Sequence, residues 1–189
     1  LSADKYNVKV ISLKGDFNFL SSIKSTAEHS WALLMSLVKK LNLSSSLTSE
    51  GIWDRDRVSP NDELDNKKLG IIGFGRLAKI VSTYAEAFNM EILAYDIDED
   101  QFNKNYANYK KSLDEVLSQS DYLFLMISYS KSNINFMNSK KFFKMKNNSY
   151  FINTSRGEMV NEKDLLENLN TGKLKGVGLD VLKNDSNWS

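Results

Sequence analysis

The sequence contains no cysteine and a single proline, Pro60. Without thiols the chain cannot form disulfides or thiolate metal sites, so we expect no bound metal and a cytoplasmic location. The sequence also lacks an excess of charge of either sign, because it has 25 basic and 24 acidic residues and a net charge of +1. This balance gives no electrostatic case for nucleic acid or an anionic membrane. No apolar run approaches the roughly 18 residues that span a bilayer.

The chain has 189 residues, of which 41% are hydrophobic, enough for one domain of ordinary size with a fragment of a second. It begins at Leu1 without an initiator methionine and ends at Ser189 without a structural stop signal. We therefore expect a piece of a longer protein.

The first third of the chain is organised differently from the rest. Residues 8–12 predict a short strand, and apolar residues at helical spacing predict a helix over residues 27–41. Residues 42–66 are rich in Ser, Asn and Asp and have little periodicity, so we expect an extended arm there.

From Lys67 onward, short apolar runs alternate with helical patterns. Strands are expected at 69–72, 91–95, 122–127, 150–152 and 177–181, and helices at 77–88, 113–117, 140–145 and 162–169. Strand–helix alternation of this kind predicts an α/β fold, with a doubly wound parallel sheet of the Rossmann type and helices on both faces.

The strongest chemical signal is a G-x-G-x-x-G/A pattern with Gly73, Gly75 and Ala78 at its three small positions. The first glycine permits the tight turn from strand to helix. The second lets a pyrophosphate approach the backbone, and Ala78 allows close helix–strand contact. Arg76 and Leu77 begin the helix, whose free N–H groups attract phosphate. A glycine turn without a ligand has the same pattern, so the context must decide between the two interpretations.

That context is an acidic residue at the end of the next strand. Asp96 lies 21 residues after Gly75, and an acid at about this spacing accepts hydrogen bonds from the adenine-side ribose. Residues 97–100 add three acids and no base, although these side chains are also typical of a solvated loop. The sequence therefore predicts dinucleotide binding, with NAD preferred over NADP.

The chain resembles the D-isomer-specific 2-hydroxyacid dehydrogenases, the group that includes D-3-phosphoglycerate dehydrogenase. The resemblance covers nearly the whole sequence and rests on five segments in the family's order: 25–29 (STAEH), 51–55 (GIWDR), 69–78 (LGIIGFGRLA), 153–157 (NTSRG) and 178–181 (GLDV). It implies two α/β domains with the active site between them. Residues 1–22 would then be a remaining piece of the substrate domain or linker, and 23–189 an NAD-binding Rossmann domain without its final elements.

The resemblance also implies hydride transfer between NAD and C2 of a 2-hydroxy or 2-keto acid. Arg156 matches the family arginine, and a planar guanidinium at the carboxyl edge of a sheet suits a substrate carboxylate. Asp185 stands where the family has glutamate, although a plain loop acid would look the same. The only histidine, His29, does not match the catalytic one, which we expect beyond Ser189. The residues present should be inactive alone.

Other cofactor contacts are implied by the same resemblance. Asp180 matches an aspartate that contacts the nicotinamide carboxamide, and Thr154 a position whose backbone faces the ring. Ser128 lies in a polar loop that we interpret as a cofactor rim. Two alternatives stay open: a non-catalytic NAD(H)-binding co-regulator or assembly protein, and an enzyme of the formate-dehydrogenase type.

We also predict a homodimer formed through residues 26–62. The helix carries an apolar stripe, and the arm after it cannot cover its own Ile52 and Trp53. Large apolar side chains left in water cost roughly 1.5–3 kcal/mol each, which a two-fold partner would offset. The resemblance implies a dimer through the same region. In the alternative, the arm folds back on its own domain.

Overall fold

The computed structural model describes residues 6 and 16–183 and contains one five-stranded parallel sheet. Its order is β2-β1-β3-β4-β5. The strands are β1 (Lys68–Ile72), β2 (Glu91–Tyr95), β3 (Tyr122–Leu125), β4 (Ser149–Asn153) and β5 (Leu174–Leu179). This arrangement confirms the predicted α/β fold.

The strand order reverses at β1. From β1 the chain moves outward to β2 and then returns to place β3 on the other side of β1. Beyond β2, Lys110 makes an isolated parallel bridge to Ala94, so the sheet is extended on that side by a single residue pair. Ligands of open α/β sheets bind at such a reversal, outside the carboxyl ends of the strands.

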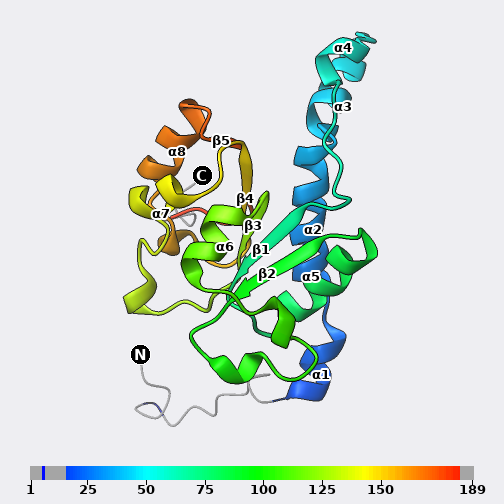
Figure 1. Cartoon of the computed structure of the whole chain (residues 1–189). Coiled ribbons are helices and arrows are strands. Elements are labelled where there is room, and N and C mark those ends of the chain that lie inside the picture. Colours follow the sequence, from blue (N-terminus) through cyan, green and yellow to red (C-terminus); the bar gives the residue numbers. More distant parts are fainter. Residues whose placement is uncertain (1–5, 7–15, 184–189) are drawn as a thin grey trace.

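Helices cover both faces of the sheet (Figure 1). On one face, α2 (Ser25–Val38) packs on β4 and β5, and α5 (Arg76–Ala87) packs on β2. The other face carries α6 (Leu113–Gln119), α7 (Ser139–Lys144) and α8 (Glu162–Asn170). Short 3₁₀ helices lie in the connections between these elements, namely η2 (Glu99–Gln101), η3 (Ala107–Tyr109), η4 (Lys131–Asn133) and η5 (Gly157–Met159).

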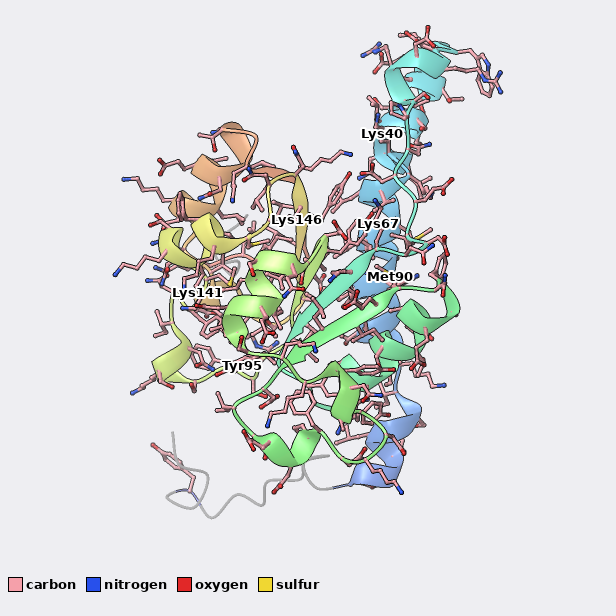
Figure 2. All side chains as sticks on the ribbon, in the orientation of Figure 1. Lys40, Lys67, Met90, Tyr95, Lys141 and Lys146 are labelled. Atoms are coloured by element: carbon pink, nitrogen blue, oxygen red, sulfur yellow. The ribbon has the colours of Figure 1, made fainter. Side chains whose placement is uncertain are left out.

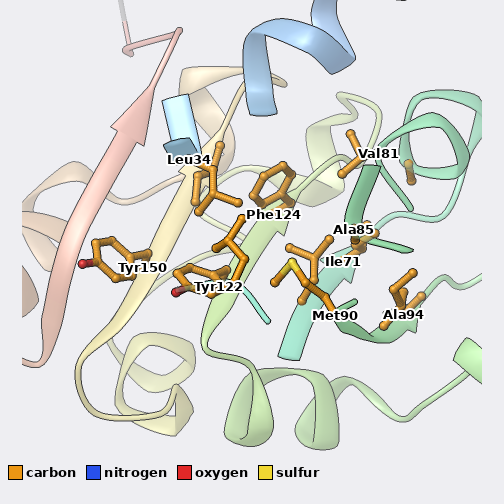
Figure 3. Packing of buried hydrophobic residues seen from close by; sticks show 14 of the residues in the cluster. Leu34, Ile71, Val81, Ala85, Met90, Ala94, Tyr122, Phe124 and Tyr150 are labelled. Carbon is orange, nitrogen blue, oxygen red and sulfur yellow. The ribbon is translucent and has the colours of Figure 1, made fainter. Parts of the chain in front are cut away.

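The core lies in two layers because neighbouring strand residues point to opposite faces. Ile71 and Phe124 belong to the layer under α2 and α5, which Figure 3 shows from close by. Their neighbours Ile72 and Leu125 belong to the layer under the other three helices. All four side chains are fully or almost fully buried, which explains why these strands are continuous apolar runs.

The segment before the sheet is more helical than expected. Residues 42–66 are not an extended arm: α3 (Leu41–Ser49) and α4 (Arg55–Val58) occupy much of them. Serine and threonine tolerate this helix because their hydroxyls donate to carbonyls four residues back, as Ser44 does to Lys40 and Thr48 to Ser44. The segment nevertheless projects beyond the sheet (Figure 1), so an arm is present in helical form.

A short helix, α1 (Phe17–Ser22), precedes α2. Asp16 caps it, with a carboxylate oxygen that accepts a hydrogen bond from the backbone N–H of Phe19 at 3.0 Å. The strand predicted at residues 8–12 lies outside the described residues. Among the described residues, no helix is both long and apolar enough to cross a membrane.

Candidate functional site

The turn between β1 and α5 has the geometry that its glycines predict. Gly73 has φ +94°, and a Cβ there would lie 2.7 Å from the backbone nitrogen of Ile127. Gly75 is different, because a Cβ there would meet nothing within 4 Å. The helix that follows has no side-chain cap and no acid in its first turn. Open space above a bare backbone, next to free N–H groups, fits a pyrophosphate.

Asp96 closes this turn from the neighbouring strand. One carboxylate oxygen accepts a hydrogen bond from the Phe74 N–H at 2.6 Å, and the other from the Asp98 N–H at 2.9 Å. These bonds fix the side chain at the carboxyl end of β2. The same oxygens retain lone pairs, which can accept hydrogen bonds from ribose hydroxyls.

Two cavities lie along this edge of the sheet. The first, which we call the Asp96 cavity, has a volume of about 440 Å³. Its wall combines the glycine turn with apolar and polar residues from the end of β2 and from the segments that follow β2 and β3, namely Gly73, Gly75, Tyr95, Asp96, Ile97, Gln101, Ile127, Ser128, Asn133 and Phe136. Figure 2 shows Tyr95 at this edge, whereas Lys67 and Lys146 lie at the opposite edge.

The second, the Arg156 cavity, has a volume of about 430 Å³. It is lined by Thr26, Leu77, Thr154, Ser155, Arg156, Asp180 and Val181, and it shares residues 126–129 with the Asp96 cavity. The loop after β3 thus separates two neighbouring chambers at the point where the strand order reverses. An elongated ligand of two halves, such as a dinucleotide, fits this shape.

The loop that carries Arg156 is held by a buried amide. Asn153 is fully buried, and its Oδ1 accepts hydrogen bonds from the N–H of Ser155 at 3.0 Å and from the Ser155 hydroxyl at 2.6 Å. Its Nδ2 donates to the Arg156 carbonyl at 3.2 Å. A Cβ on Gly157 would lie 2.1 Å from the Leu182 carbonyl carbon, so only glycine fits there. Arg156 itself is exposed on this rigid loop, where its guanidinium can meet an anion.

The helix α2 reaches the Arg156 cavity as well. Ser30 Oγ lies 2.7 Å from Thr154 Oγ1, and His29 Nε2 lies 3.2 Å from Asp180 Oδ1. The contact of His29 was not predicted, because a lone histidine on a helix is usually exposed or structural. Both contacts join a helix to residues directly after β4 and β5.

The structure brings most of the predicted site residues to one edge. Gly73, Gly75 and Asp96 line the first cavity, Ser128 lines both, and the others line the second, namely Leu77, Thr154, Arg156 and Asp180. The Arg76 side chain lies apart from them and donates to the Leu20 and Ile23 carbonyls of the α1 region at 2.6 and 2.7 Å. A contact of Arg76 with phosphate through its backbone N–H would leave these two side-chain hydrogen bonds intact. Asp185 lies outside the described residues.

An aromatic cluster beneath the turn was not anticipated. Phe74 stacks on Phe102 with ring centroids 5.1 Å apart and meets Tyr106 and Tyr109 edge-on. Burial, together with a hydrogen bond to Glu86, raises the pKa of Tyr109 to about 12. The cluster anchors the irregular segment after β2, where apolar periodicity is too weak to predict it.

Comparison with known proteins agrees with this geometry. Residues 31–187 match the family described as D-isomer specific 2-hydroxyacid dehydrogenase, NAD binding domain. A hydroxypyruvate reductase of Blautia hydrogenotrophica is 32% identical over 166 residues, which are 85% of this chain and 52% of the relative. The chain thus spans about half the length of the curated relatives it matches.

Solved structures give the same result. D-lactate dehydrogenase from Aquifex aeolicus, in complex with NAD and lactic acid, superposes with a TM-score of 0.82 at 31% identity, covering 96% of this chain and 53% of that one. NAD-dependent formate dehydrogenase from Staphylococcus aureus, in complex with NAD, gives 0.83 at 30%, covering 98% and 54%. These similar proteins are reductases and dehydrogenases, which favours an oxidoreductase over a non-catalytic co-regulator. The chain belongs to the D-isomer-specific 2-hydroxyacid dehydrogenase family, and it is the NAD-binding domain of that family.

Proposed function

We propose that the whole protein is an NAD-dependent oxidoreductase that transfers a hydride between the CH–OH carbon of a 2-hydroxy acid and the cofactor. The observation that carries this proposal is Arg156, an exposed guanidinium on a rigid loop beside the dinucleotide cavities. A permanently charged, planar donor suits the carboxylate that all 2-hydroxy and 2-keto acids share.

The residues of the two cavities divide the work of binding. Gly75 and the first turn of α5 would hold the pyrophosphate, and Asp96 the adenine-side ribose. Thr154 and Asp180 would orient the nicotinamide end beside Arg156. When bound, NAD supplies the ring carbon that accepts or releases the hydride. Arg156 would bind the substrate carboxylate and stabilise negative charge on the neighbouring oxygen.

Replacement of Arg156 tests this proposal in the purified full-length protein. Activity is followed as loss of NADH absorbance with glyoxylate, hydroxypyruvate, pyruvate or 2-ketogluconate, and as NADH formation with formate. We expect turnover of at least one 2-keto acid. Arg156→Gln should lower kcat/KM on the order of 10²–10³-fold, with NADH affinity nearly unchanged.

Other outcomes of the same assay contradict the proposal. Tight NADH binding without turnover of any acid would favour the co-regulator. Turnover of formate alone would place the protein among formate-dehydrogenase-type enzymes. Turnover that is unaffected by Arg156→Gln would remove the assigned role of that side chain.

We propose further that the protein forms a homodimer through residues 26–62. In support, the Trp53 side chain is 82% exposed in the single chain, and Ile52 is 38% exposed. These two residues line a groove with Leu47 and Val58 on the projecting α3–α4 segment. A second copy would bury these side chains. The cytoplasm stays our predicted location, because the sequence contains no cysteine.

A further inference from the structure

Two side chains of α2 contact the wall of the Arg156 cavity. His29 Nε2 lies 3.2 Å from Oδ1 of Asp180, and Ser30 Oγ lies 2.7 Å from Oγ1 of Thr154. Asp180 and Thr154 both line the cavity. One helix therefore supports two lining residues that come from different strands.

The contact from His29 restricts what Asp180 can do. A carboxylate only accepts hydrogen bonds, so the proton at this contact belongs to His29 Nε2. The backbone of Asp180 is fixed as well, because its N–H donates to the Asn153 carbonyl at 3.1 Å. The contact at Oδ1 sets the orientation of the carboxylate, and among the described residues no hydrogen bond engages Oδ2, which can accept from a donor inside the cavity. Without that contact, the half-exposed side chain would sample several rotamers.

The neighbouring contact directs Thr154 in a similar way. The Ser30 hydroxyl has one proton, and it donates that proton to the Thr26 carbonyl at 2.7 Å. The Thr154 hydroxyl must then donate to Ser30, so its oxygen can only accept from within the cavity. Both residues thus offer acceptors, which suits a ligand group that carries N–H donors.

We propose that His29 is a positioning residue for the nicotinamide end of the cofactor. It orients the Asp180 carboxylate so that Oδ2 accepts a hydrogen bond from the carboxamide N–H. His29 does not transfer a proton in this role. The inference rests on the proposed function, since it requires that NAD occupies both cavities with its nicotinamide beside Arg156.

Two ligands separate this role from a general structural one. NADH contains the nicotinamide, whereas ADP-ribose contains the remainder of the cofactor without that ring. Affinities for both are measured on the purified protein, NADH by its fluorescence and ADP-ribose by calorimetry. The variants are His29→Ala, His29→Gln and, as a matched control, Glu28→Gln, which changes a neighbouring exposed side chain of the same helix.

We expect His29→Ala to weaken NADH about three- to tenfold, the effect of one modest hydrogen bond. Its affinity for ADP-ribose should stay within about twofold of wild type, because surface changes remote from a contact have small effects. His29→Gln should recover most of the NADH affinity, since its amide N–H extends about as far as Nε2–H. Glu28→Gln should bind both ligands as wild type does.

Three results would overturn the inference. NADH affinity unchanged in His29→Ala would show that Asp180 needs no support. An equal loss for both ligands would show that His29 supports only the fold. Wild-type protein that binds neither ligand would remove the proposed function and this inference with it, whereas the first two results leave the proposed function intact.

Discussion

Replacing Asp96 is expected to change how the protein distinguishes NAD from NADP. The structure fixes this carboxylate between two backbone N–H groups, at 2.6 and 2.9 Å, on the wall of the first cavity. We assign the adenine-side ribose to the space beside these oxygens. The 2′-phosphate of NADP would bring like charge to the same place, and the described residues that line this cavity include no lysine or arginine.

The size of the discrimination follows from Coulomb's law. Two like charges about 4 Å apart near a protein surface repel by up to ~4 kcal/mol before salt screening. Asp96 is partly exposed, and ions at physiological strength reduce the repulsion, so roughly 1.5–3 kcal/mol should remain. This corresponds to NADPH binding about 10- to 150-fold more weakly than NADH.

The assay is a fluorescence titration of both reduced cofactors. In Asp96→Ala, NADH should bind more weakly because the ribose loses its acceptor and two N–H groups lose their partner. NADPH should not gain affinity in absolute terms, since no cation replaces the carboxylate. Wild-type protein that binds NADPH as tightly as NADH would refute the reasoning.

Three further perturbations have defined outcomes. Gly73→Ala places a Cβ against backbone at positive φ, so it should destabilise the fold by about 2–5 kcal/mol in thermal or urea unfolding; unchanged stability would contradict this geometry. Burial raises the pKa of Asp62, but hydrogen bonds from Lys175 and Tyr150 hold it below its usual value. The contribution of Asp62 to folding stability is therefore present at neutral pH and lost as the pH falls through that lowered pKa. Asp62→Asn should thus cost about 0.5–1 kcal/mol at pH 7 and progressively less as the pH falls below the ordinary carboxyl range; an undiminished difference in strong acid would be inconsistent with this reasoning. Trp53→Ala should shift the predicted dimer towards the monomer of 21.5 kDa in light scattering, whereas a wild-type monomer unaffected by concentration would exclude the dimer.

The sequence was informative where one residue type satisfies a local physical requirement. Gly73 is predictable because the turn needs a positive φ and close approach to Ile127. The strands around Ile71 and Phe124 are predictable because both faces of a parallel sheet are buried. The strong motifs therefore predicted the fold class and eight of the residues that line the two cavities at the carboxyl edge of the sheet.

The sequence was less informative where contacts join distant segments. The pairing of His29 with Asp180 spans most of the chain, and no local pattern indicates it. The prediction missed the helix α3, because serine by itself favours loops over helices. In the structure, hydroxyl-to-carbonyl hydrogen bonds such as that of Ser44 satisfy the serine side chains within the helix. The Arg76 side chain donates hydrogen bonds to carbonyls of the α1 region. The glycine motif does not indicate this contact, because it specifies only the residues next to Arg76.

The most direct test of NAD binding at this edge is the affinity of Gly75→Ala for NADH. The backbone at Gly75 is extended at φ −80°, and a Cβ there meets no atom within 4 Å, so the fold should keep its melting temperature. The same methyl group would occupy the space that we assign to the pyrophosphate. We predict that wild-type protein binds NADH and that Gly75→Ala binds it at least about tenfold more weakly, a loss of ~1.4 kcal/mol. Equal NADH affinity in the two proteins, at equal stability, would contradict the assignment of this turn as the cofactor site.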